Sequence, residues 1–532
     1  MDYKHFGVML DCSRNAVPNV PSVKKLIDAL QKMGYNTLEL YTEDTLTVEG
    51  EPYFGYLRGR YSREEIKEID AYAAARGIEL IPCIQTLAHF TNSVKLPRFW
   101  DITDVDDILL IDEPETYEFL ERVFAELANS FTSRNVNIGM DEAHHVGLGK
   151  YFEKHGACDR FELLTRHLSR VAKIAEKYGF TAHMWSDMFF RLACGDYYNT
   201  DAVIPKYIIE AIPDNVELTY WDYYHIEKSH YDANLAVHKK FGKDLWFAGG
   251  AWTWLGYTPH ARFALGALLA SMQSVRENNI QNVLVTLWGD NGGECAPFSV
   301  LQVLYAARRY ADGEYDTEKI CAEFDKLFGI SYSDFCLLEL PDIIPNKDKF
   351  KMQNPAKALL YCDPFVGVWD IAAQKNAVIP YGEYAKQLKA AIGRTGEFAY
   401  LFRTTEKLCR VLELKAYLGV NTRKAYRSGD KKALKKIISD YAETEKRVAE
   451  FFETYKVQWH TVNKPFGFEI ICARLGGLKQ RLLYCKKQLQ AYVSGKLNRV
   501  EELEEEILPL SEQASDNLYC NQYSRIVSPS EL

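Results

Sequence analysis

The sequence predicts an α/β protein, a closed (β/α)₈ barrel of the TIM-barrel type followed by a mostly α-helical C-terminal region. Three observations predict this fold. Strand-like runs alternate with amphipathic helical patterns eight times in the first 313 residues, and eight such units close a barrel. The runs are continuously apolar, as in parallel strands covered by helices. From residue 314 onward, helical patterns dominate. We therefore expect the barrel over residues 1–313 and the helical region over residues 314–532.

The predicted strands and helices alternate in order along the barrel. The first helical pattern illustrates the assignment, because Val23, Leu26, Ile27, Leu30 and Met33 form one apolar stripe. Strands are expected near residues 5–12, 37–43, 79–85, 135–141, 181–187, 216–223, 244–251 and 282–288. Helices are expected near residues 22–33, 62–76, 115–131, 162–178, 205–212, 230–241, 261–279 and 298–312. A doubly wound open sheet would also alternate, but no G-x-G-x-x-G motif follows the first strand.

Glycines mark the ends of four of these helices. Gly34, Gly77, Gly179 and Gly242 stand just past a helical pattern, where a left-handed C-cap conformation is needed, and each precedes a strand. In the C-terminal region, long helical patterns cover residues 386–419, 430–460, 474–495 and 500–510. The acidic run within the last of these is typical of a solvated helix face.

Composition excludes several classes of partner. The 532 residues carry a formal net charge of −9, which predicts no binding to nucleic acid or to anionic membranes. No run approaches the roughly 18 apolar residues of a membrane span, and the N-terminus lacks the pattern of a signal peptide. The 12 cysteines are scattered without a C-x-x-C pair, as expected of reduced thiols. We therefore expect a cytoplasmic protein.

Polar and aromatic residues follow every predicted strand. In a (β/α)₈ enzyme the reactive groups lie at the C-terminal ends of the strands, so these residues share one rim. The fourth strand ends in GMDEAHH, where two acids, Asp141 and Glu142, are adjacent. The other strand ends supply Asp11 and Arg14; Glu43 and Asp44; Gln85 and His89; Trp185 and Asp187; Trp221, Asp222, Tyr223 and Tyr224; Trp252 and Trp254; and Trp288, Asp290 and Glu294. Tryptophan faces beside carboxylates and an arginine suit a sugar, which stacks and hydrogen-bonds at once.

Metal chemistry is the competing use of this rim. His89, His144 and His145, with the two adjacent acids, offer zinc ligands, but no H-E-x-x-H motif is present. A G-x-S-x-G nucleophile motif and a P-loop are also missing from the sequence. We expect neither a metal nor a cofactor.

The strand-end motifs resemble glycoside hydrolase family 20, the β-N-acetylhexosaminidases. NIGMDEAH is similar to the family's catalytic [HN]-x-G-x-D-E motif, and GVMLDCSRNAV is similar to its first strand. HMWSDMF, TYWDYY and LWGD resemble its tryptophan-bearing strands 5, 6 and 8. The motifs span roughly residues 5–310 and are most similar to the intracellular, hexosaminidase D-like subgroup with bacterial members.

The resemblance implies a retaining exo-glycosidase. It would release terminal, non-reducing β-linked GlcNAc or GalNAc from a glycan or glycoconjugate, and a homodimer is compatible with the subgroup. The family is assisted by its substrate, whose 2-acetamido group replaces the protein nucleophile through an oxazoline intermediate. Glu142 would then be the general acid and base, and Asp141 would orient the acetamido N–H. Because an ionised Asp141 disfavours ionisation of Glu142, their adjacency gives the two acids different pKa values.

Further roles follow from the same resemblance. Arg14 and Asp290 would bind the outer hydroxyls of the sugar, with Asp290 standing where the family usually has Glu, so the gluco or galacto preference stays open. Tyr223 would donate to the acetamido carbonyl, and His89 would support Glu142, with Glu43 or Asp44 behind it. Trp185, Trp221, Trp252 and Trp288 are the tryptophans expected at the sugar, whereas Trp254 and Tyr224 are equally explained by packing.

Two alternatives remain open from the sequence. One is a barrel glycosidase with two protein carboxylates, Glu142 with Asp290 or Glu294. The other is a non-catalytic sugar-binding or scaffold protein.

Overall fold

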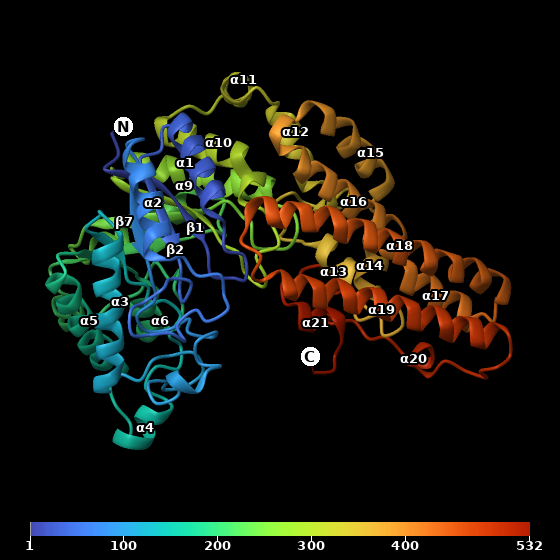
Figure 1. Cartoon of the computed structure of the whole chain (residues 1–532), viewed down its shortest axis with the longest axis horizontal. Helices are drawn as coiled ribbons and strands as arrows, with labels where there is room; N and C mark the ends of the chain where they lie inside the picture. The colour runs from blue at the N-terminus through green and yellow to red at the C-terminus, as the bar shows by residue number, and fades with distance from the viewer. Residues whose placement is uncertain (1, 532) are drawn as a thin grey trace.

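The computed structural model describes residues 2–531 and contains a closed barrel of eight parallel strands, with a helical region beside it (Figure 1). The strands are β1 (His5–Asp11), β2 (Thr37–Tyr41), β3 (Glu79–Cys83), β4 (Asn135–Asn137), β5 (Thr181–Trp185), β6 (Val216–Trp221), β7 (Leu245–Gly250) and β8 (Asn282–Leu287). Each strand pairs with its neighbours in sequence, and β1 closes the barrel by pairing with both β2 and β8. The predicted fold class is confirmed, and every strand lies within its predicted range.

Helices cover the outside of the barrel as the sequence predicts. These are α1 (Val20–Met33), α2 (Arg63–Ala74), α3 (Pro114–Ser130), α5 (Arg160–Lys177), α7 (Lys206–Ala211), α8 (Lys228–Lys239), α9 (Ala261–Glu277) and α10 (Leu301–Asp312). Local signals set their ends: Ser62 and Glu65 form a reciprocal capping box at the start of α2, and Gly34 ends α1 with a φ of 82°. Three short elements were not predicted, namely η1 (Pro97–Phe99), α4 (Lys150–His155) and α6 (Asp187–Cys194), whereas η2 (Pro297–Val300) forms the start of the helix predicted near residues 298–312.

The barrel interior below the strand ends is packed with large side chains. The ring of Trp246 lies between the rings of His5 and His183, with centroid distances of 4.6 and 4.2 Å. His183 in turn lies 3.0 Å from the carboxylate of Glu39, and both side chains are buried. A filled interior gives the residues at the barrel mouth a rigid floor.

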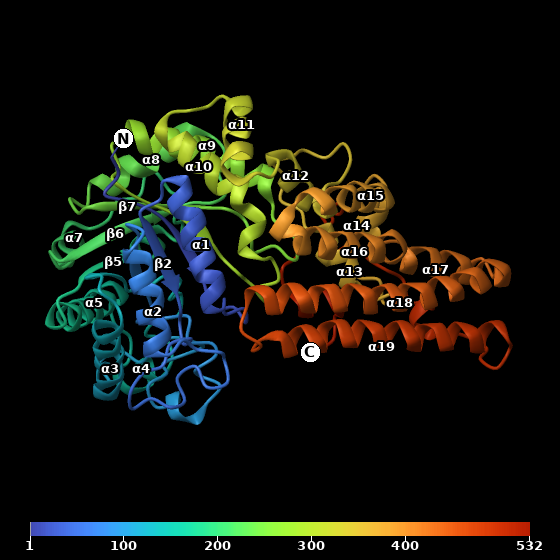
Figure 2. The ribbon, with the colours of Figure 1, turned by 45° about the horizontal axis from the view of Figure 1, so that its top comes forward.

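The C-terminal region is helical, as predicted. Its elements are α11 (Thr317–Phe328), α12 (Tyr332–Cys336), η3 (Leu337–Asp342), α13 (Pro355–Tyr361), α14 (Asp370–Lys375), α15 (Tyr381–Ala391), η4 (Ile392–Arg394), η5 (Gly396–Phe398), α16 (Ala399–Lys415), α17 (Leu418–Arg427), α18 (Lys431–Val462), α19 (Phe468–Val493), α20 (Glu501–Glu504) and α21 (Tyr523–Val527). The two long helices α18 and α19 run side by side away from the barrel (Figure 2). A domain boundary at residue 313 stays a prediction.

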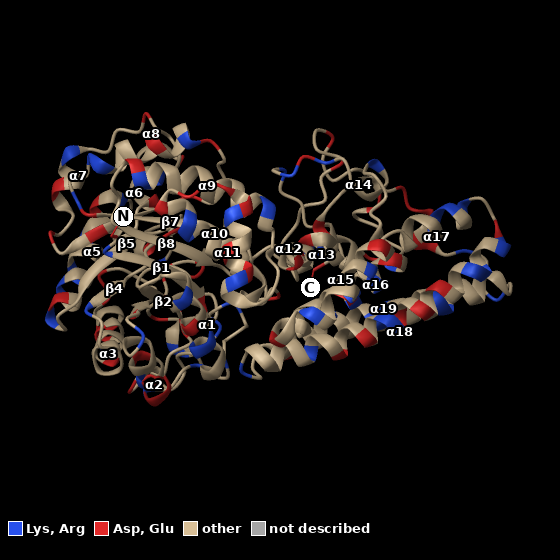
Figure 3. Cartoon of the chain, turned by 90° about the horizontal axis from the view of Figure 1, so that it is seen from above, with Lys and Arg blue, Asp and Glu red and all other residues tan. Residues whose placement is uncertain are grey.

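Charges of both signs are distributed over the barrel and the helical region (Figure 3). Among residues 2–531, no helix is long and apolar enough to cross a membrane.

Candidate active site

The strand ends converge on one pocket at the mouth of the barrel. It is a concave pocket that combines aromatic rings with a few convergent charged groups, as small-molecule sites do. Its lining consists of Arg14, His89, Asp141, Glu142, Trp185, Trp221, Tyr223, Tyr224, Trp254, Trp288 and Asp290. The structure therefore brings together nine of the ten site residues that the sequence predicts, and the tenth, Trp252, lies behind the lining.

Several residues at the mouth have a left-handed backbone that side chains other than glycine rarely adopt. Glu43, His89, Met140, Glu142 and Trp252 have φ angles between 45° and 71°. Each such residue costs about 1 kcal/mol or more, and residues of this kind cluster where a fold must aim a side chain. Such residues at the strand ends are typical of a site where the fold aims side chains, and they make the mouth the candidate site.

Asp141 is held as a carboxylate by its neighbours. Its Oδ1 accepts a hydrogen bond from Nε2 of Gln85 at 2.7 Å, and its Oδ2 lies 3.1 Å from Nε2 of His89. Burial opposes ionisation, but the charge of His89 and the hydrogen bonds from His89 and Gln85 hold the pKa of Asp141 below its usual value. The same ion pair outweighs burial at His89 and raises its pKa to about 10. The pair is therefore an imidazolium bound to a carboxylate at neutral pH.

Glu142 has the opposite electrostatic environment. Burial and the negative charge of Asp141 raise its pKa above the usual range of a glutamate. Its Oε2 lies 3.9 Å from His89, its Oε1 lies 3.6 Å from Nη2 of Arg191, and its side chain is 43% exposed toward the pocket. Asp187 fixes the turn, because its Oδ2 accepts hydrogen bonds from the backbone N–H of Glu142 and from Nε of Arg191. One acid of the pair is thus kept ionised and the other is poised to carry a proton.

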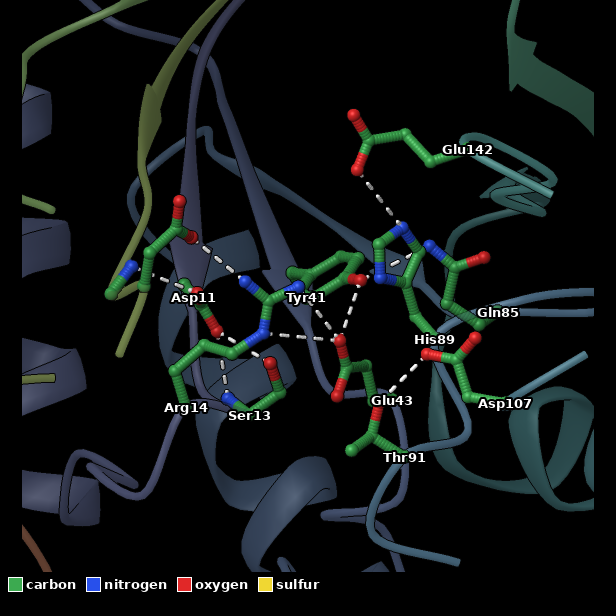
Figure 4. Close-up of polar contacts among 12 residues, drawn as sticks. Asp11, Ser13, Arg14, Tyr41, Glu43, Gln85, His89, Thr91, Asp107 and Glu142 are labelled. Atoms are coloured by element: carbon green, nitrogen blue, oxygen red, sulfur yellow. Dashed lines mark hydrogen bonds and ion pairs between the residues drawn. The ribbon is translucent and has the colours of Figure 1, made fainter. Parts of the chain in front are cut away.

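A series of hydrogen bonds connects Asp141 with the opposite side of the mouth, and Figure 4 shows its part from Gln85 through Tyr41 and Glu43 to Arg14. Beyond Asp141, Nε2 of Gln85 contacts the Tyr41 hydroxyl at 3.0 Å, and this hydroxyl donates to Oε1 of Glu43 at 2.8 Å. The guanidinium of Arg14 then donates to Glu43 at 3.0 Å and to Oδ1 of Asp290 at 2.8 Å. This series of hydrogen bonds crosses the ends of β4, β3, β2, β1 and β8, so each side chain in it holds its neighbour in position.

Aromatic rings build the rest of the pocket wall. Trp185 and Trp288 meet at 6.1 Å with a tilt of 47°, and Trp221 stacks on Tyr223 at 5.3 Å. Nε1 of Trp288 donates to the hydroxyl oxygen of Tyr223 at 3.1 Å, which leaves the hydroxyl hydrogen free to point elsewhere. The edge of Trp254 packs against Tyr223 at 5.5 Å. This part of the wall therefore consists of aromatic rings, and the two tyrosines of the lining, Tyr223 and Tyr224, add hydroxyl groups.

Asp222 fixes the part of this wall that comes from β6. Its buried carboxylate accepts a hydrogen bond from the hydroxyl of Tyr220 at 2.8 Å and lies within 3.1 Å of ring nitrogens of His225 and His230. These three groups, Asp222 and the two histidines, are near enough to hold a metal ion. The two imidazoles stack at 3.4 Å with an angle of 15°, and a ring nitrogen of each reaches the same oxygen of Asp222. These contacts hold Asp222, and with it Trp221 and Tyr223, which flank it in the chain.

Trp252 requires a correction. Its side chain is 0% exposed, stacks on Trp254 at 4.6 Å and donates from Nε1 to the carbonyl of Tyr223. The left-handed backbone at Trp252 turns its ring behind the wall, and Trp254 occupies the position at the pocket. We therefore replace Trp252 by Trp254 in the proposed set of sugar contacts.

His89 and its supporting acids also differ from the prediction. The nearest carboxylate to His89 is Asp141, not Glu142, and Glu43 pairs with Arg14. Asp44 lies 3.2 Å from the guanidinium of Arg58. Arg191 and Tyr41 were not predicted as site residues, although Asp187 and Arg191 stand four residues apart, which is the spacing of a helical ion pair.

Glu294 takes no part in the pocket. It is 3% exposed, and its carboxylate oxygens lie 2.8 Å from Arg474 and 2.8 Å from Lys357, both in the helical region. Both carboxylate oxygens of Glu294 are therefore paired with cations from a distant part of the chain, so this carboxylate is not free to act as a nucleophile. Of the other residues considered as zinc ligands, His145 pairs with Asp106 at 2.7 Å at the surface.

Comparison with known families matches both regions of the chain. The model of the glycosyl hydrolase family 20 catalytic domain matches residues 3–234, and the model of the glycoside hydrolase 20C C-terminal domain matches residues 333–521.

Individual relatives are more distant. A β-hexosaminidase of Vibrio furnissii is 33% identical over 178 residues, which cover 26% of this chain and 29% of that protein. Human hexosaminidase D is 25% identical over 236 residues, covering 43% of this chain and 45% of that protein. The chain thus spans less than half the length of either relative. A crystal structure of a family 20 exo-β-N-acetylglucosaminidase from Vibrio harveyi, in complex with N-acetylglucosamine, is similar with 18% identity and a TM-score of 0.48, covering 63% of this chain and 58% of that one.

Proposed function

Because the chain belongs to glycoside hydrolase family 20, we propose that it is an exo-β-N-acetylhexosaminidase that removes terminal, non-reducing β-linked GlcNAc or GalNAc with retention. The observation that carries this proposal is the pair Asp141 and Glu142 at the barrel mouth, whose pKa values shift in opposite directions. A low pKa suits a group that must stay ionised, and a raised pKa suits a general acid at neutral pH.

The proposed reaction has two steps. In the first, the carbonyl oxygen of the substrate's acetamido group attacks C1, the glycosidic C1–O bond breaks, and Glu142 transfers its proton to the leaving oxygen. Asp141 accepts a hydrogen bond from the acetamido N–H and stabilises the positive charge of the oxazolinium ring. In the second, a water attacks C1 and reopens this ring, while the carboxylate of Glu142 takes the water's proton. Two inversions at C1 give net retention, and both acids return to their starting states.

The remaining pocket residues support binding of a single terminal sugar. The guanidinium of Arg14 and the carboxylate of Asp290, 2.8 Å apart, are suited to bridge neighbouring hydroxyls. Trp185, Trp221, Trp254 and Trp288 offer rings to the apolar sugar face and to the acetamido methyl. The hydroxyl of Tyr223, whose oxygen already accepts from Trp288, is the proposed donor to the acetamido carbonyl.

The two-carboxylate alternative has less support. Asp290 is committed to Arg14, and Glu294 is buried between Arg474 and Lys357. We also propose a cytoplasmic location and a homodimer, on the resemblance to the hexosaminidase D-like subgroup; all twelve cysteines are unpaired, which is compatible with a reducing compartment.

The test compares hydrolysis of an aryl β-N-acetylglucosaminide by the wild type and by Glu142→Gln. We expect the variant to lose about 10²–10⁴ in kcat, the contribution of a positioned general acid. Glu153→Gln, at an exposed glutamate of α4 in the same strand-end loop, is the matched control and should keep full activity. A thiazoline analogue of the sugar should inhibit the wild type competitively. Wild-type turnover by Glu142→Gln would refute the acid role, and indifference to the thiazoline would favour a protein nucleophile.

A further inference from the structure

The loop that follows β8 carries Asp290 but has little to hold its own shape. Residues 288–294 read WGDNGGE, and Asn291, Gly292 and Gly293 all have positive φ angles. Glycine-rich segments of this kind have many accessible conformations. Inside the barrel, the backbone N–H of Gly289 donates to Asp11 at 2.9 Å and that of Gly293 donates to Gly289 at 2.7 Å. The barrel also holds the first part of the loop, where Thr253 donates to the carbonyl of Trp288 at 2.7 Å and Arg14 donates to Asp290 at 2.8 Å. The side-chain contacts of Asn291 and Glu294, by contrast, come from the helical region.

Two buried cations of the helical region, Arg474 and Lys357, bind Asn291 and Glu294 of the loop after β8. Arg474 of α19 donates from Nη1 to the carbonyl of Asn291 at 2.8 Å and to Oε1 of Glu294 at 2.8 Å. Lys357 of α13 lies 2.8 Å from Oε2 of Glu294 and 3.5 Å from Oδ1 of Asn291. Glu294, Lys357 and Arg474 form what we call the junction cluster.

Two more segments of the helical region reach the same loop. The hydroxyl of Tyr455, on α18, donates to the carbonyl of Glu294 at 2.8 Å. The backbone N–H of Tyr523, at the start of α21, donates to Oδ1 of Asn291 at 3.1 Å. Four segments that are far apart in sequence therefore converge on Asn291 and Glu294.

The loop after β7, which carries Trp254, is held in the same way. Asn354 is fully buried just before α13, and its side-chain amide donates to the carbonyl of Leu255 at 2.8 Å. The stem of Lys357 passes Gly256 so closely that a β-carbon there would lie 3.1 Å from Cβ of Lys357. The helical region thus contacts the supports of two pocket residues, Trp254 and Asp290.

Stability alone is a poor reason for such a cluster. Two cations face one carboxylate, Lys357 is 1% exposed and Glu294 is 3% exposed. Removing charges from water costs several kcal/mol per ion, and an apolar replacement of a buried ion pair is often neutral or stabilising. An apolar replacement could not orient the loop, because the hydrogen bonds from Arg474 and Lys357 hold both the carbonyl and the side chain of Asn291, to which Tyr523 adds one contact. Asn291 directly follows Asp290.

We propose that the helical region is a working part of the sugar pocket, and that Lys357, Arg474 and Glu294 are positioning residues that set Asp290 against Arg14 through the β8 loop. This inference rests on the proposed function, since it takes Asp290 as a ligand of the sugar's outer hydroxyls. Those hydroxyls are held equally in the ground state and in the transition state. Loosening the loop should therefore weaken binding more than it slows chemistry.

The experiment removes one cation of the cluster in the full chain. Lys357→Met keeps an unbranched side chain, one atom shorter, removes the charge and leaves Glu294 paired with Arg474. We expect KM for an aryl β-N-acetylglucosaminide to rise about tenfold or more, with kcat changed less than about threefold, the pattern of lost uniform binding. The matched control is Lys464→Met, which breaks another ion pair between the helical region and the barrel, 2.6 Å to Glu65, away from the loop. This control should leave KM unchanged.

A double-mutant cycle identifies the route of the effect. In an Asp290→Asn background, Lys357→Met should raise KM no further, because both changes remove the same contact. Additive effects, or a wild-type KM in Lys357→Met, would overturn the inference. If Lys357→Met does not fold, Glu294→Gln, which keeps the shape and removes the charge, takes its place with the same expectations.

Hydrogen exchange separates this inference from the proposed function. Amides of residues 288–294 should exchange faster in Lys357→Met than in the wild type and in Lys464→Met, whatever the substrate proves to be. Unchanged exchange there would overturn the inference even in an active enzyme. A wild type that hydrolyses no amino sugar while its variant shows the faster exchange would overturn the proposed function and leave the junction cluster as the support of the loop.

Discussion

His89 pairs with Asp141 rather than with Glu142: its Nε2 lies 3.1 Å from Oδ2 of Asp141 and 3.9 Å from Oε2 of Glu142. The pair separates the tasks of the two adjacent acids. His89 supplies the positive charge that keeps Asp141 ionised. Burial and the ionised Asp141 raise the pKa of Glu142, against a smaller lowering by His89 itself. The imidazole therefore stabilises the ionised form of Asp141, while burial is the main cause of the raised pKa of Glu142.

The pair predicts a pH dependence of stability that His89→Gln should remove. The pKa of His89 is raised from 6.5 to about 10, so its contribution is full below pH 6.5 and is lost as the pH rises through 10. Glutamine retains a neutral hydrogen bond but no charge. We expect the variant to unfold about 2 kcal/mol more easily at pH 6, the order of a hydrogen bond to a charged group, with the difference shrinking toward pH 10. Denaturant unfolding at both pH values checks this, and a constant difference would contradict it.

Arg191 should set the alkaline limit of activity. It lies 3.6 Å from Glu142 and lowers the pKa of that acid, against the larger raising effects of burial and Asp141. Removing the cation in Arg191→Met therefore raises the pKa of Glu142 further. A general acid works while protonated, so the alkaline limb of the kcat profile should move to higher pH. Arg191→Lys retains the charge and should move it less. An alkaline limb at the wild-type position in Arg191→Met would exclude this role.

The main features of the barrel could be predicted because they depend on short-range signals. Continuous apolar runs predict parallel strands, and the number eight predicts closure, which places every strand end on one rim. The loop backbone decides whether a side chain at that rim faces the pocket. A φ of 55° at Trp252 turns its ring behind Trp254, and no pattern in AWTW indicates that angle.

Long-range pairing explains the other differences. The sequence leaves Glu294 open as a nucleophile, because its partners, Lys357 and Arg474, lie far away in the sequence. No local pattern predicts how that region packs against the barrel. Arg191 was overlooked because helix α6 was not predicted, and only that helix brings it beside Asp187. The residue types at the strand ends indicate the proposed function. The protonation states of these residues, and the long-range contacts that hold them, could be obtained only from the folded structure.

Tyr223→Phe should weaken the assistance of the substrate. The hydroxyl oxygen of Tyr223 accepts a hydrogen bond from Trp288, so its hydrogen is available to the acetamido carbonyl that attacks C1. Loss of that contact leaves the attacking oxygen less well aimed, and a misplacement of about 1 Å can cost about 10² in rate. We expect kcat/KM to fall by about 10–10² and the affinity for the thiazoline to fall with it. Tyr207→Phe, on the exposed face of α7, is the control. A thiazoline affinity equal to that of the wild type would argue against this contact.

Gly139→Ala should displace Gln85 and so weaken its hydrogen bond to Asp141. Gly139 has a φ of 70°, and a β-carbon there would lie 2.1 Å from Oε1 of Gln85 and 2.9 Å from the carbonyl of Ile84. Gln85 must then move, and it is the hydrogen-bond donor to Asp141.

Gly179→Ala is the matched control for this change. Gly179 has a φ of 78° but open space, with its nearest neighbour at 3.9 Å, so both variants carry the strain of a left-handed alanine, about 1 kcal/mol. Only Gly139→Ala adds a collision, and we expect it to cost about 2 kcal/mol more in the free energy of unfolding, within the range of overpacked sites. Since Gln85 helps to keep Asp141 ionised, activity should fall about tenfold or more in Gly139→Ala alone, as positioning losses do. Equal stability and equal kcat in the two alanine variants would mean that Gln85 is free to retreat, and that Asp141 depends on His89 alone.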